Sequence, residues 1–226
     1  MIITMSRQAA TNGGLTARLA AQRLGLRVYD REVVDEIARR MQVDPGVVVR
    51  FDEVTMSPVQ SILMEWRNSI NESIYQRHLR EALERIREDG DAVIIGRGAN
   101  FVLSGPDCLH VRIVAPLDLR VGIYRTVYPE VSEQEARQRI RAEDREKARF
   151  IRAQFKAAID DPIHYDLLLN VGGIGPETAV ELIEHAAKTR AGLTRSLLPE
   201  HLRIMSRHRR PARPGVVEEY YFEPEG

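Results

Sequence analysis

The sequence of 226 residues has one cysteine, no excess charge of either sign and no long apolar run. A single cysteine, Cys108, excludes a disulfide framework and a cysteine-rich zinc site, and it suits a reducing compartment. Lysine plus arginine and aspartate plus glutamate each number 33, so the overall charge does not indicate a nucleic-acid coat or a membrane-surface protein. No apolar stretch reaches the roughly 18 to 20 residues of a membrane span. We therefore expect a soluble cytoplasmic protein, with Cys108 in a structural role.

The six histidines are scattered along the chain and do not have the spacing of metal ligands. We therefore predict no metal site built from protein side chains. Structural or solvent-exposed roles account for these histidines better.

Short apolar runs alternate with helical patterns over most of the chain. The alternation predicts a three-layer α/β fold, in which helices cover both faces of a parallel sheet and the first strand is central. The five predicted strands lie near residues 1–6, 27–29, 92–96, 109–115 and 167–171. Among the helix signals, Gly25 is a plausible stop for the first helix, and Ser132 can cap the backbone amide of Glu135.

A polar loop with two adjacent glycines follows the first strand. Glycines let a backbone approach a phosphate closely, and the N-terminus of the next helix adds a partial positive charge. The run from Arg7 to Gly14 nevertheless lacks the spacing and the lysine of the common phosphate-binding motif. Taken alone, the loop fits an ordinary strand-to-helix turn equally well. The residues that we expect to bind a nucleotide are Arg7, Ala10, Thr11, Asn12, Gly13 and Gly14.

Four motifs in order resemble the cytidylate kinase-like family. They are the Ser6-Arg7-Gln8 run with its glycine turn, Tyr29-Asp30-Arg31-Glu32, the run from Val93 to Gly98, and Tyr165 to Asn170, within a match over about residues 1–185. The resemblance implies a fold of the P-loop NTPase type with a five-stranded parallel sheet. In that family the loop typically reads Ser-Arg-Gln/Glu-Tyr-Gly-Ser-Gly-Gly, so here Ala10 and Asn12 replace glycines. Both replacements restrict the backbone.

The resemblance also implies a division of the chain. We expect a kinase-like domain over residues 1–190, with a helical acceptor-side insertion at 45–89 and a lid-like region at 128–158. Trp66 belongs to the apolar stripe of the insertion. Residues 191–226 change in composition, with an arginine-rich stretch before an acidic end, and read as a tail.

Acceptor-binding residues are likewise implied by the resemblance. Arg97 would take the acceptor's phosphate, and Asp30 and Arg31 would flank the acceptor. From the charged stretch between the fourth and fifth strands, we also select Asp144 as a contact for the base or sugar. A helix cap is an equal alternative for Asp30, and a surface arginine is an alternative for Arg97. The family's aspartate after Gly-Arg is Gly98 here.

The charged stretch between the fourth and fifth strands would supply lid cations for phosphoryl transfer. Our choices for catalysis are Arg141, Arg145 and Lys147. A solvated helix with internal ion pairs is an equal alternative.

The function that the resemblance implies is ATP-dependent phosphoryl transfer to a (deoxy)cytidine monophosphate, with ATP as co-substrate and Mg²⁺ carried by the nucleotide. The rival is a nucleotide-binding or regulatory module that has lost turnover. Nucleic-acid binding through the arginines at 203–213 is the least favoured reading. We expect nucleotides as the main ligands, and a homodimer is left open.

Overall fold

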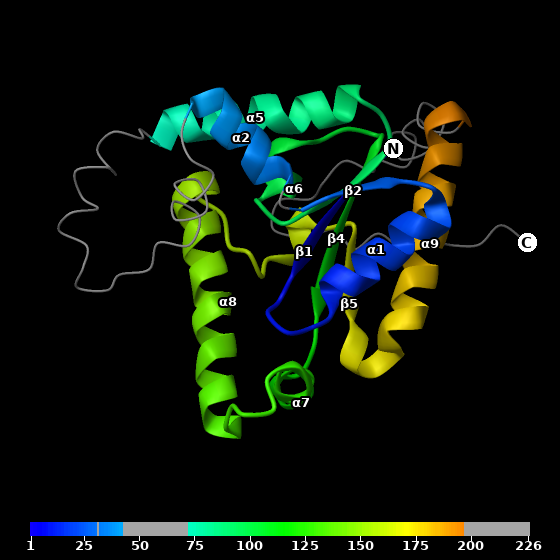
Figure 1. Ribbon diagram of the computed structural model, residues 1–226. Helices are drawn as coiled ribbons and strands as arrows, with labels where there is room; N and C mark the ends of the chain where they lie inside the picture. The colour runs from blue at the N-terminus through cyan, green and yellow to red at the C-terminus, as the bar shows by residue number, and fades with distance from the viewer. Residues whose placement is uncertain (31, 43–71, 197–226) are drawn as a thin grey trace, which may run out of the picture.

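A five-stranded parallel sheet forms the centre of the computed structural model, which describes residues 1–30, 32–42 and 72–196 (Figure 1). The strand order is β2-β3-β1-β4-β5, and every pairing is parallel. The strands are β1 (Ile2–Arg7), β2 (Arg27–Tyr29), β3 (Ala92–Ile95), β4 (Cys108–Val114) and β5 (Leu167–Asn170). The predicted sheet with a central first strand is confirmed, and each strand begins and ends within one residue of its predicted limits.

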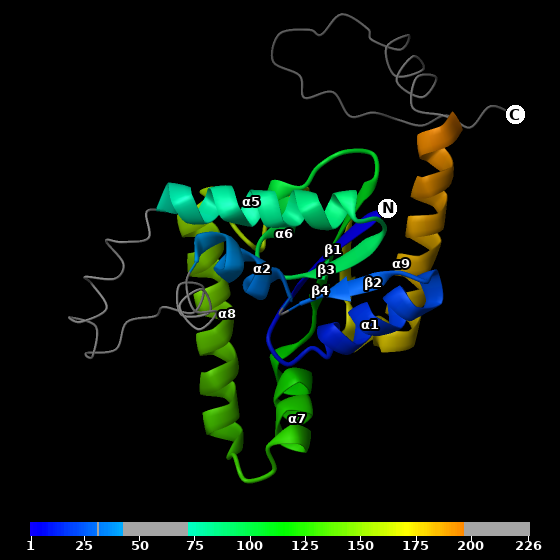
Figure 2. The same cartoon turned by 45° about the horizontal axis from the view of Figure 1, so that its top comes forward.

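Helices cover both faces of the sheet. On one face lie α1 (Gly13–Leu24) and α9 (Val171–Ser196), and on the other lie α2 (Glu32–Met41), α5 (Glu72–Glu88) and α6 (Ala99–Val102). The connection from β4 to β5 contains α7 (Leu117–Val127), α8 (Glu133–Phe155) and the short 3-10 helix η2 (Pro162–His164). Figure 2 shows α7 and α8 joined by a tight turn and extending away from the sheet.

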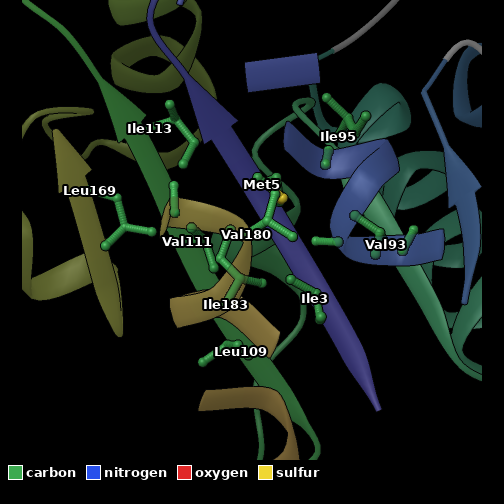
Figure 3. Close-up of a cluster of buried hydrophobic side chains, with 14 of the residues drawn as sticks. Ile3, Met5, Val93, Ile95, Leu109, Val111, Ile113, Leu169, Val180 and Ile183 are labelled. Carbon is green, nitrogen blue, oxygen red and sulfur yellow. The ribbon is translucent and has the colours of Figure 1, made fainter. Parts of the chain in front are cut away.

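The core on the α1 and α9 side follows from strand alternation. Ile3 and Met5 of β1 point to this face, as do Val111 and Ile113 of β4, and all four are essentially inaccessible to solvent. Figure 3 shows them meeting Val180 and other side chains of α9. Burying one such side chain contributes about 1.5 to 3 kcal/mol.

The opposite face is filled by α5. Its Tyr75, Leu79 and Leu83 are fully buried against Ile2 and Ile94 of the sheet. The described part of the predicted 45–89 insertion therefore packs directly on the sheet. Residues 43–71, which include Trp66, and residues 197–226 of the predicted tail lie outside the described residues.

Helix boundaries follow the local signals of the sequence. Gly25 ends α1 in a left-handed conformation (φ 68°), and the Ser132 hydroxyl accepts a 3.2 Å hydrogen bond from the Glu135 amide, as predicted. Helix α9 is interrupted at Gly175 (φ 78°), directly before Pro176. It then continues to Ser196, past the boundary predicted at residue 190.

Cys108 is fully buried at the start of β4. Burial raises the pKa of its thiol to about 11, which keeps the thiol protonated at neutral pH and agrees with a structural role. Within residues 1–30, 32–42 and 72–196, no helix combines the length and the apolar character needed to cross a bilayer.

Candidate functional site at the carboxyl edge of the sheet

Three predicted site segments meet where β1, β2 and β3 end. Met5 of β1 pairs with Ile95 of β3, and Tyr29 of β2 pairs with Ile94, so the three strands finish at nearly the same level. The loop after β1, Asp30 after β2 and the turn at residues 96–98 after β3 therefore share one edge. Open α/β sheets bind ligands at this edge.

The loop after β1 keeps the shape of a glycine-rich loop without all the glycines. Ala10 and Asn12 both adopt left-handed backbone angles, each with φ 56°. A left-handed conformation costs a residue with a Cβ about 1 to 2 kcal/mol, and Asn pays less than most. The structure therefore holds, at Ala10 above all, a conformation that glycine adopts more readily.

Close approach at the start of α1 requires Gly13. A Cβ at this position would lie 2.9 Å from Cβ of Arg7 and 3.1 Å from Oγ1 of Thr11. The Thr11 hydroxyl, which is buried, donates to the Gln8 carbonyl at 3.0 Å and accepts from the Gly13 amide at 3.3 Å. Thr11 thus fixes the loop from inside, at the cost of using one amide that could face a phosphate.

A partly buried ion pair holds the beginning of the loop from outside. One oxygen of Asp144 in α8 accepts from the Ala9 amide at 2.8 Å, and the other accepts from Nη1 of Arg120 in α7 at 2.5 Å. The same nitrogen of Arg120 donates to the Ala9 carbonyl at 3.3 Å. Arg120 is 8% exposed and Asp144 is 25% exposed. Asp144, predicted to contact an acceptor, has both carboxylate oxygens engaged with the loop and α7.

The lid residues chosen for catalysis do not all point the same way. Lys147 places its ammonium 3.5 Å from the Arg7 carbonyl, next to the loop, and also pairs with Glu143 at 2.7 Å. Arg141 and Arg145 are exposed, and Arg145 lines a cavity elsewhere on α8. A role for Arg141 or Arg145 in phosphoryl transfer requires the lid to rearrange.

Asp30 lies between two arginines. Its carboxylate is 3.8 Å from Nη2 of Arg7 and 3.7 Å from Nη2 of Arg18. Its amide donates to the Glu32 carboxylate at 2.9 Å, and this hydrogen bond is the largest cause that lowers the pKa of Glu32. Asp30 thus links the start of α2 to the loop after β1. Arg31 lies outside the described residues.

Arg97 stands at the centre of a turn made of three left-handed residues. The φ angles are 76° at Gly96, 55° at Arg97 and 65° at Gly98. A Cβ at Gly98 would overlap the ring of Phe155 and lie 3.1 Å from Cδ1 of Ile151, so the turn packs directly on the end of α8. An aspartate at this position would require the Phe155 ring to move.

Two buried arginines were not identified from the sequence. Arg120 lies on the same side of α7 as the apolar residues Leu117, Val121 and Tyr124. A cation within such an apolar stripe could have indicated a buried ion pair. Arg112 of β4 is 3% exposed, and it donates to Ser6 at 2.7 Å and to Asp160 at 2.5 Å. In β4, His110 and Arg112 alternate with Val111 and Ile113, and this pattern could have indicated a polar patch on the face of the sheet that carries Arg112.

Metal-binding side chains do not gather in the part of the chain that the structure covers. Across residues 1–30, 32–42 and 72–196, no group of three or more histidine, cysteine, aspartate or glutamate residues could hold a metal ion.

The chain is similar in sequence to one protein family and in fold to several solved structures. Among solved structures, an uncharacterized protein from Eubacterium ventriosum has a TM-score of 0.63 at 17% identity, covering 83% of this chain and 98% of that chain. A shikimate kinase from Bacteroides thetaiotaomicron has a TM-score of 0.47 at 13% identity, covering 83% of this chain and 98% of that chain. No curated protein matches the sequence. The sequence profile of the cytidylate kinase-like family matches residues 2–173. Since that match spans most of the chain, the protein belongs to the cytidylate kinase-like family.

Proposed function

We propose that the protein transfers the γ-phosphoryl group of Mg²⁺-ATP to a nucleoside monophosphate of the (deoxy)cytidine type. The observation that carries the proposal is the meeting of a tight loop at the start of α1 with the Arg97 turn at one edge of the sheet. The loop suits the donor and the turn suits the acceptor. Family membership supports a kinase-type reaction.

The donor would bind to the loop mainly through backbone amides. Gly13 brings the backbone close, and α1 has no acidic residue in its first turn, so its N-terminus keeps a partial positive charge toward a phosphate. The loop itself contains no lysine, but α8 brings Lys147 beside it. We assign to Lys147 the task of offsetting charge on the group in transfer. The Mg²⁺ ion would arrive on the nucleotide.

The acceptor would bind beside the turn after β3. A guanidinium presents a planar set of donors that matches phosphate oxygens, and the glycines on both sides of Arg97 let it lie close to the sheet edge. Asp30, next to Arg7 and Arg18, would flank the acceptor on the β2 side.

The loop also supports a second candidate function, a nucleotide-binding module without turnover. Ala10 and Asn12 hold strained angles, and the Gly13 amide is already bonded to Thr11. The bonded Gly13 amide is one donor fewer for a phosphate, and the Cβ atoms of Ala10 and Asn12 restrict the backbone that would have to adjust to one. Magnesium-dependent formation of ADP from ATP and CMP separates the two functions, because only the enzyme produces ADP above the rate without acceptor.

Calorimetry on two variants tests the location of both subsites. Arg97→Ala should weaken CMP binding by about 1.5 to 3 kcal/mol, the usual range for hydrogen bonds to charged groups, while ATP binding changes little. Gly13→Val should abolish ATP binding, because its side chain would collide with Arg7. Unchanged CMP affinity in the first variant together with unchanged ATP affinity in the second would place the ligand site elsewhere.

A further inference from the structure

A separate cavity of about 260 Å³ opens between the C-terminal half of α8 and the segment that leads to β5. Three arginines, Arg145, Arg149 and Arg152, line it from the helix. Its apolar lining comes from Ala148, Ala158 and Ile159, and Asp160 completes the wall. No lining residue belongs to the loop after β1, to Asp30 or to the turn at 96–98, so this cavity differs from the proposed donor and acceptor subsites.

The arginines of this cavity differ from those at the other end of the same helix. Near the start of α8, Arg137 pairs with Glu133 and Asp118, and Arg139 pairs with Glu135. Within the described residues, Arg145, Arg149 and Arg152 have no carboxylate at ion-pair distance. Among the residues that the structure describes, the arginines near the start of α8 are therefore paired with carboxylates, while the three arginines at the cavity are not.

The one carboxylate in the wall is already paired. Asp160 accepts from Nη2 of Arg112 at 2.5 Å, and the Arg112 guanidinium lies 5.6 Å from the centre of the Tyr165 ring. Because Arg112 is almost completely buried, this pair fixes the wall, and the Arg112 charge offsets part of the repulsion that the exposed Asp160 would exert on an anion.

Favourable interaction with the helix dipole explains only part of this arrangement. Cations near a helix C-terminus are stabilised, but the effect fades beyond the last turn. Arg145 lies roughly three turns before the end of α8. The dipole therefore does not account for three arginines on one cavity.

We propose that this cavity binds a small phosphate-bearing molecule. The guanidinium groups would hold the phosphate, and the apolar surface of Ala148, Ala158 and Ile159 would contact a ring or hydrocarbon portion. The cavity lies just below the range of roughly 300 to 1,000 Å³ for small-molecule sites. It therefore suits a monophosphate with a single ring rather than a nucleoside triphosphate.

Phenyl phosphate is a suitable probe, because it combines one phosphate with one apolar ring. Calorimetry on the full chain should show one bound molecule in the Gly13→Val/Arg97→Ala background, where both the loop after β1 and the proposed acceptor subsite are blocked. Arg149→Ala/Arg152→Ala should weaken this binding at least tenfold, which corresponds to about 1.4 kcal/mol. The matched control, Arg137→Ala/Arg139→Ala, removes the same charge from the same helix and should change the affinity less than twofold.

A second variant tests the cavity without removing an arginine. Ala158 is exposed, so Ala158→Glu should leave the core intact and place a carboxylate beside the guanidinium groups. It should weaken phenyl phosphate binding as much as the double arginine variant does. Inorganic phosphate should bind more weakly than phenyl phosphate if the apolar surface contributes. Equal losses in both double variants, unchanged binding in Ala158→Glu, or no binding to the Gly13→Val/Arg97→Ala protein would overturn the proposal. None of these results depends on whether the protein transfers phosphate.

Discussion

The loop after β1 and the turn after β3 both contain left-handed residues at the carboxyl edge of the sheet, but different interactions hold them in shape. The turn has glycine at two of its three left-handed positions, on both sides of Arg97. The loop has Ala10 and Asn12 at its left-handed positions, and it is held by side chains from elsewhere, including Asp144 of α8 and Arg120 of α7. The shape of the turn is therefore encoded more by its own residues, whereas the shape of the loop depends more on long-range contacts.

The largest expected effect comes from removing the long-range support of the loop. Asp144→Ala leaves Arg120 buried without its partner, and breaking such a pair typically costs 3 to 5 kcal/mol. Because a quarter of the Asp144 side chain is exposed, we expect the free energy of unfolding to fall by about 3 kcal/mol, at the lower end of that range.

Denaturant unfolding measures this change, and ATP binding to the folded variant should weaken more than CMP binding. The control is the neighbouring Glu143→Ala, which removes an exposed pair with Lys147 and should cost less than about 1 kcal/mol. Similar losses in the two variants would show that Asp144 does not support the loop.

The turn should be sensitive to a single methyl group. In Gly98→Ala the new Cβ meets the Phe155 ring at a positive φ, so overpacking and left-handed strain add together. We expect the free energy of unfolding to fall by about 2 kcal/mol. Phe155→Ala in the same chain should make the Gly98→Ala change cost less, as a double-mutant cycle would measure.

Gly122→Ala provides the matched control for the turn. Gly122 lies within α7, and a Cβ there has nothing within 4 Å. This change should stabilise the protein by up to about 1 kcal/mol. A destabilisation as large as that of Gly98→Ala would contradict the special packing of the turn.

The smallest expected effect is a gain in stability from Ala10→Gly. Glycine removes the free-energy cost of the left-handed conformation, about 1 to 2 kcal/mol. It also increases the conformational entropy of the unfolded chain, which lowers the gain by about 0.5 to 1 kcal/mol. The free energy of unfolding should therefore rise by about 0.5 to 1 kcal/mol. Ala142→Gly, within α8, should instead lower it by about 1 kcal/mol. A loss of stability at both positions would mean that Ala10 is not strained.

The sheet could be predicted from the sequence because its signals are local. Apolar runs such as Val93-Ile94-Ile95 end at glycine, and they predict buried parallel strands without knowledge of their neighbours. The same holds for the cap at Ser132. The ion pair between Arg120 and Asp144 joins two helices, and the sequence of neither helix indicates which residue of the other helix is its partner. The sequence therefore did not reveal that Asp144 accepts a hydrogen bond from the Ala9 amide, and a contact between Asp144 and an acceptor stays a prediction.

Helix α8 touches both candidate subsites. Its 23 residues form one helix of roughly 34 Å, which contacts the loop through Asp144 and packs on the turn through Phe155. Its sequence contains no glycine or proline, so we expect it to move as one rigid body. If the region at 128–158 acts as the proposed lid, a ligand that changed the tilt of α8 would act on both subsites at once, and the affinities of donor and acceptor would be linked.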